Sequence, residues 1–204
     1  MIPAKLKLSK EEKELISDAN VILTKNMILK KTESLLGHLS EQQIAYTKKE
    51  KSTFPEEILK LPPKISKGEN YLGLPYRVLD YPRFFDNKDI FMVRTMFWWG
   101  NFFSVTIQLA GKYKTAFEKK LQERWPELQE NGIYFCINED PWQHHFENAN
   151  YLPCSDITLD QLESYLGKTD FLKMAIKEDL DTWENAREIL FAHFTSLSKI
   201  VAES

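Results

Sequence analysis

The chain has 204 residues, of which 43% are apolar and 28% are charged, so it has the length and composition of a soluble globular domain with a sizeable core. Its 27 basic and 30 acidic residues give a net charge of −3, which offers no electrostatic reason to expect nucleic acid or an anionic membrane as a partner. The longest uncharged run, residues 95–111, is too short and too polar for a membrane helix.

The cysteine content and the N-terminal residues bear on the compartment. Cys136 and Cys154 are too few for a disulfide framework, and their separation matches no zinc-ligand spacing. The N-terminal residues MIPAKLKLSKEEKEL lack the apolar core of a secretory signal. We therefore expect a cytoplasmic protein with reduced thiols, and no motif in the sequence indicates a cofactor.

The first predicted element is one long amphipathic helix over residues 9–39. Ser9 and Glu12 have the spacing of a capping box, and apolar residues follow at helical intervals. Residues 40–68, which contain Pro55, Pro62 and Pro63, predict an irregular connection. The apolar stripe of the helix suits packing within its own chain, and it also suits the seam of an oligomer.

The most apolar stretch, residues 90–111, predicts a β-hairpin with arms 90–99 and 102–109. Its second arm alternates between two unlike faces, and Gly100-Asn101 suits a two-residue type II′ turn. This turn pairs Trp99 with Phe102 and places Arg94 opposite Ile107 on an apolar face. A buried guanidinium there requires a carboxylate partner.

Further strands are predicted at 76–81 and 133–138, with a crossover helix over 112–125 between the hairpin and the last of them. Residues 151–204 predict a helical C-terminal part. The whole chain, 1–204, is expected to form one α+β domain. Its aromatic sheet core, residues 69–150, would be a mainly antiparallel sheet of about four strands, packed by long N- and C-terminal helices.

One candidate site centres on the hairpin. Asp80 is a candidate ion-pair partner of Arg94, and a structural ion pair is the simplest interpretation. The alternative is a pocket in which Arg94, Trp98 and Arg83 bind a small anionic or aromatic ligand. The face carrying Trp99 and Phe102 would form an interface if no helix covers it.

A second candidate site is the polar and aromatic loop over residues 139–147. It contains Asp140, Trp142, His144, His145 and Glu147, and the spacing of His144 and Glu147 would suit a metal only on a helix. Cys136 and either histidine are residue types that can act as nucleophile and base. However, no helix N-terminus or glycine-rich turn is expected near Cys136 to lower the pKa of its thiol, so a buried structural thiol is the simpler interpretation.

These patterns support three hypotheses about function. The first is a non-enzymatic small-ligand-binding or protein-interaction module that uses the hairpin and the 139–147 loop. The second is a metal-assisted hydrolase that uses the acidic residues and histidines of that loop, although no metal site can be specified from the sequence. The third is a homo-oligomer held together by the terminal helices.

Overall fold

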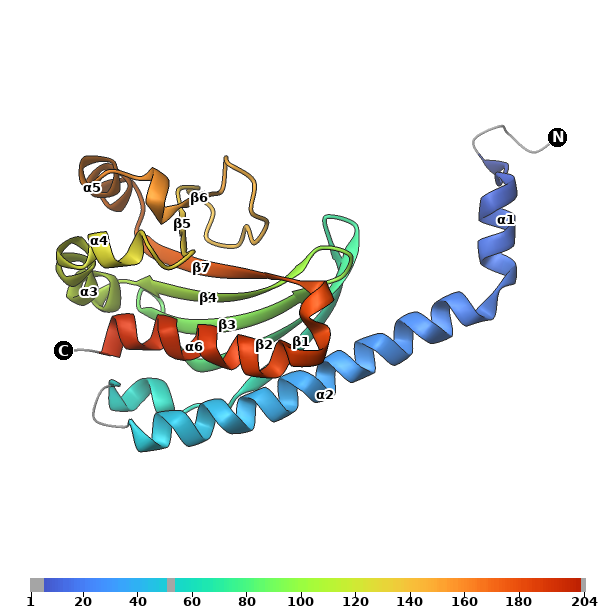
Figure 1. Ribbon diagram of the computed structural model, residues 1–204, viewed down its shortest axis with the longest axis horizontal. Coiled ribbons are helices and arrows are strands. Elements are labelled where there is room, and N and C mark those ends of the chain that lie inside the picture. The colour runs from blue at the N-terminus through green and yellow to red at the C-terminus, as the bar shows by residue number, and fades with distance from the viewer. Residues whose placement is uncertain (1–5, 51–53, 203–204) are drawn as a thin grey trace.

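Figure 1 shows a computed structural model of the chain, in which residues 6–50 and 54–202 are described. The helices are α1 (Lys10–Ser17), α2 (Ala19–Lys49), α3 (Lys112–Glu123), α4 (Trp125–Leu128), α5 (Leu159–Lys168) and α6 (Ala186–Ala202), with 3-10 turns η3 (Glu56–Leu59), η4 (Cys154–Asp156) and η5 (Leu180–Asn185). The strands are β1 (Lys64–Tyr71), β2 (Leu74–Phe85), β3 (Ile90–Trp98), β4 (Phe102–Ala110), β5 (Tyr134–Cys136), β6 (Tyr151–Pro153) and β7 (Phe171–Asp179).

The predicted α+β class is confirmed. In the described residues the strands form one seven-stranded sheet in the order β1-β2-β3-β4-β7-β5-β6, and every pairing is antiparallel. The predicted count of about four strands is too low. The four predicted strands correspond to β2, β3, β4 and β5, while β1, β6 and β7 were not expected.

Two segment predictions are wrong for a physical reason. The irregular connection predicted over 40–68 is wrong at both ends, because α2 continues to Lys49 and β1 begins at Lys64. Nor is the part from 151 to 204 entirely helical, because Phe171–Asp179 forms the interior strand β7. This strand is covered on both faces, so most of its side chains are buried and the usual alternation of polar and apolar residues is absent. β7 also separates β4 from β5, the two strands that the α3 connection joins.

The N-terminal helix is broken, contrary to the prediction of one helix over 9–39. The capping box is present as predicted, with Glu12 N donating to Ser9 Oγ and Ser9 N donating to Glu12 Oε2. Asp18 then adopts an extended backbone, ends α1, and caps α2 by accepting a hydrogen bond from Asn20 N at 2.8 Å. As a result α1 points in a different direction from α2 (Figure 1).

The two faces of the sheet are covered differently. Apolar residues such as Val93, Phe103 and Ile107 share a buried cluster with Leu36 of α2 and Phe194 of α6, so the long helices pack on this face, which we call the helix face. Figure 1 shows α2 and α6 lying across it. The opposite face, here called the loop face, contacts residues 137–150, the loop between β5 and β6.

None of the helices within residues 6–50 and 54–202 combines the length and the apolar content that crossing a membrane requires. The longest of them, α2, carries several lysines along its exposed side.

Candidate functional site

The hairpin register places Arg94 in a polar environment. Trp98 pairs with Phe102 through a three-residue loop in which Gly100 adopts φ +70°, so the predicted pairing of Trp99 with Phe102 is wrong by one residue. Arg94 therefore lies opposite Thr106 and not Ile107. Its side chain is on the loop face with the polar residues of β4, while Val105 and Ile107 face the helices.

Asp80 is the carboxylate partner of Arg94. The two residues pair directly between β2 and β3, and the guanidinium binds the carboxylate through two hydrogen bonds, Nε to Oδ1 at 2.7 Å and Nη2 to Oδ2 at 2.9 Å. Both side chains are largely buried, with exposed fractions of 14% for Arg94 and 8% for Asp80. A bidentate pair of this kind provides the carboxylate that a buried guanidinium requires.

The 137–150 loop is fastened to the loop face by aromatic contacts and turn hydrogen bonds. Phe146 stacks on Tyr151 with ring centroids 4.6 Å apart and meets Phe102 edge to face. Asn150 Nδ2 donates to His145 O at 2.6 Å, and the Asp140 carboxylate accepts from Trp142 N at 2.9 Å. The loop consequently has a defined conformation over the ion pair.

Tyr71, at the end of β1, joins this loop to the hairpin. Its hydroxyl oxygen accepts a hydrogen bond from His144 N at 2.6 Å and lies 2.9 Å from His145 Nδ1. Its backbone carbonyl accepts from Trp98 Nε1 at 3.2 Å. Sequence reasoning did not identify Tyr71, because no strand was predicted before residue 76.

His144 is held as a neutral imidazole. Its Nε2 lies 3.2 Å from Arg94 Nη1, which has only N–H groups to offer, so the histidine nitrogen is the acceptor. Burial is the largest of the effects that lower the pKa of His144 to about 2, and the positive charges of Lys173 and Arg94 contribute to the same shift. Arg94 thereby gains a third hydrogen bond, and the neutral imidazole adds no positive charge next to the guanidinium.

Lys173 of β7 is the residue of this cluster that sequence reasoning missed. Its Nζ donates to the backbone carbonyls of Pro141 and Gln143 in the loop and lies 5.2 Å from the ring centre of Tyr151. Burial lowers its pKa to about 8. The cross-strand neighbour Gln108 is fully buried, and its side-chain nitrogen and oxygen have no hydrogen-bond partner among the described residues.

Three of the predicted ligand-binding residues are less central. Trp142 is 48% exposed and lies over the Arg94 guanidinium, whose carbon is 5.9 Å from the ring centre. Arg83 Nε donates to Pro62 O at 3.0 Å, so the Arg83 side chain connects β2 to the segment before β1. Glu147 contributes its backbone carbonyl to the turn that leads to Tyr151.

The loop does not have the geometry of a metal-assisted active centre. His144 points to Arg94 and His145 to Tyr71, while Asp140 bonds within its own turn. Within the part of the chain that the structure describes, no three His, Cys, Asp or Glu side chains form a group that could hold a metal ion. Burial raises the pKa of Cys136, which opposes formation of a nucleophilic thiolate.

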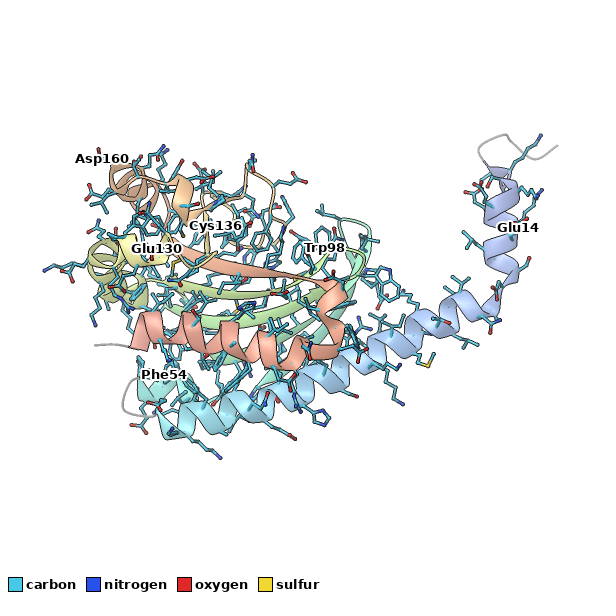
Figure 2. All side chains as sticks on the ribbon, in the orientation of Figure 1. Glu14, Phe54, Trp98, Glu130, Cys136 and Asp160 are labelled. Carbon is cyan, nitrogen blue, oxygen red and sulfur yellow. The ribbon has the colours of Figure 1, made fainter. Side chains whose placement is uncertain are left out.

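A separate surface, in the N-terminal part of the chain, is formed by exposed apolar side chains. Of the fourteen large apolar side chains that are exposed in the described residues, eight lie between Leu6 and Met27, with exposed fractions from 41% to 71%: Leu6, Leu8, Leu15, Ile16, Val21, Ile22, Leu23 and Met27. We call residues 6–27 the arm. Figure 2 shows α1, including the labelled Glu14, standing clear of the rest of the molecule.

A groove begins where the arm joins the body. It has a volume of about 520 Å³ and lies between α2 and the η5–α6 segment, with Met27, Leu35 and Trp183 as apolar lining. Its remaining lining is mainly basic or polar: Lys30, Lys31, Ser34, His38 and Arg187. We call this feature the basic groove.

Comparison of the chain with protein-family models, with curated proteins and with solved structures finds no match.

Proposed function

We propose that this protein is a non-enzymatic protein-interaction module and that the arm is its binding surface. The observation that carries the proposal is the concentration of eight exposed large apolar side chains in residues 6–27. Soluble proteins rarely leave a contiguous apolar surface in water, and surfaces of this kind are typical of protein interfaces.

The arm has no comparable role in the fold of its own chain. No residue of α1 is buried, and the first buried residue of α2 is Leu29. Burying a leucine or isoleucine fully yields about 1.5–3 kcal/mol, so covering the arm would release several such increments that the isolated chain does not obtain. Arg94 and Asp80, by comparison, already form an ion pair with each other, and both side chains are largely buried.

The proposed compartment is the cytoplasm. Cys136 and Cys154 are free and buried in the structure, which agrees with a reducing environment.

A photoreactive amino acid at Leu23 of the full chain tests this proposal. Leu23 is 61% exposed in the arm, and Leu159, which is 45% exposed at the start of α5, provides a helical control position. We expect a protein adduct from position 23 and none from position 159, and the adduct should disappear when Ile16 is replaced by Ser. The identified partner must also bind when purified. Equal labelling from both positions, or no adduct from position 23, would contradict the proposal.

A second candidate function is binding of a small anion under the 137–150 loop. It is favoured by one observation, the unpartnered and fully buried amide of Gln108 beside Lys173. An unsatisfied buried amide costs about 1–3 kcal/mol, which a ligand or water could recover. Opening of the loop would give a carboxylate or phosphate access to Lys173, Arg94 and this amide.

Thermal unfolding in the presence of acetate or phosphate tests this second function. We expect the anion to raise the Tm of the unaltered chain and to have little effect on a Gln108→Leu variant. A matched neutral compound such as acetamide serves as the control. If no small carboxylate or phosphate changes the Tm, the candidate site has only a structural role.

A further inference from the structure

We infer that the arm binds a second copy of this chain, with the acidic helix α1 of each copy lying in the basic groove of the other. This inference rests on the proposed function and specifies its partner. It is supported by the charges of the two surfaces, by their continuity along α2, and by the reach of the arm.

The charges of the two surfaces are complementary. The basic groove is lined by Lys30, Lys31 and Arg187 together with apolar side chains, and its lining includes no carboxylate. Arg187 also pairs with the adjacent Glu188, whereas the two lysines lie on α2. Lys30 and Lys31 are exposed and form no ion pair with any described residue. The helix α1 carries Glu11, Glu12 and Glu14 against Lys10 and Lys13, which gives it a net charge of −1, and it also carries exposed leucine and isoleucine side chains. An amphipathic acidic helix has the apolar and ionic groups that such a groove would contact.

The groove and the arm form one continuous surface. Leu23 and Met27 are four residues apart on α2, so they share a helix face, and Met27 also lines the basic groove. If α1 of each copy lies in the basic groove of the other, the same surface of each copy makes the contact. Such a contact is isologous, so both grooves are filled at once and the assembly closes as a dimer.

The groove is out of reach of α1 from its own chain. Asp18 alone connects the two helices, so an α1 folded back against α2 would cover about 12 Å of it, as far as residue 26. The groove lining on α2 starts at Met27 and extends to His38, about 16 Å farther along the axis. An acidic α1 in the groove must therefore come from another molecule.

Charge reversal and rescue test this inference. The mass of the full chain would be measured by light scattering and its self-association by sedimentation equilibrium, for the unaltered chain and for the variants Lys30→Glu/Lys31→Glu and Glu11→Lys/Glu14→Lys. We expect a dimer whose dissociation constant rises about tenfold or more in each reversed variant. Mixing the two reversed variants in equal amounts should restore association, because both groove contacts in each mixed dimer are again complementary in charge.

A covalent readout gives the geometry. Ile16→Cys and Leu35→Cys, introduced together, should form a disulfide between copies and none within a copy, whereas Leu159→Cys with Leu35→Cys should form neither. A monomer at all concentrations overturns the inference. A dimer that charge reversal leaves intact also overturns it, because the grooves are then not the contact.

Failure of this inference can be distinguished from failure of the proposed function. A monomeric chain that still forms a specific adduct with a different protein from position 23 retains an interaction arm with another partner. A monomeric chain that forms no adduct would contradict both the dimer and the proposed role of the arm in binding another protein.

Discussion

Replacement of His144 by Gln should remove the loss of stability that the titration of this histidine causes between about pH 7 and about pH 5. The folded-state pKa of His144 is lowered from 6.5 to about 2 by burial and by the neighbouring cations. Between these two values the unfolded chain binds a proton that the folded chain does not bind, so the free energy of unfolding decreases as the pH falls below 6.5. Glutamine keeps an oxygen that can accept the hydrogen bond from Arg94 but cannot be protonated in this range.

The expected magnitude follows from the same two pKa values. Each pH unit below 6.5 removes about 1.36 kcal/mol, so the stability contributed by a neutral His144 should decrease by about 2 kcal/mol from about pH 7 to about pH 5. Urea unfolding followed by tryptophan fluorescence would measure this for the unaltered chain and for His144→Gln. The difference between the two curves isolates the histidine from all other titrating groups.

Two results would refute this reasoning. Parallel stability curves for the two proteins over this pH range would mean that His144 does not resist protonation in the folded state. A nitrogen chemical shift showing that the His144 ring is protonated near neutral pH would mean that it does not accept a hydrogen bond from Arg94.

Three further predictions concern the body of the protein. Asp80→Asn should lower the free energy of unfolding by about 3–5 kcal/mol in urea titrations, because it leaves Arg94 buried without its carboxylate, and replacing both residues by apolar ones should cost less. Lys173→Met should remove a gain in stability of up to about 3 kcal/mol that the unaltered chain shows between about pH 8 and pH 10.5, where the unfolded lysine is protonated and the folded one is not. Gly111→Ala should lower the Tm more than Gly132→Ala, since both glycines have positive φ but only a Cβ at position 111 would lie 2.1 Å from a neighbouring carboxylate oxygen.

The hairpin illustrates how far sequence patterns determine the fold. Both arms were predicted within a residue of their observed bounds, because alternation of side chains along 102–109 is a strong signal of a strand. The register was not, because Gly100 can serve a two-residue or a three-residue loop and only the surrounding packing selects between them. The one-residue error moved Arg94 to the wrong set of β4 neighbours.

The missed strand β7 explains why the candidate site was incomplete. Ile176, Leu180 and Trp183 are spaced as on a helix, although the first belongs to β7 and the others to η5. Without β7 there was no reason to place Lys173 near the loop. The composition of residues 139–147 indicates a candidate site, but the contact of His144 with Arg94 joins positions fifty residues apart and depends on tertiary packing.

The exposed arm can be explained by where the sheet ends. The buried residues of α2 recur every three or four positions from Leu29 to Thr47, and the same stripe continues toward the N-terminus through Lys25 and Ile22. Lys25 Nζ pairs with Glu69 of β1 at 2.8 Å, at the edge strand of the sheet, and Ile22 beyond it is exposed. The apolar stripe of α2 therefore extends past the edge of the sheet toward the N-terminus, where the described part of its own chain offers no surface for it to pack against. At a concentration at which the chain is monomeric, polar substitutions in the arm should leave the Tm of the body unchanged, because their effect is then confined to association.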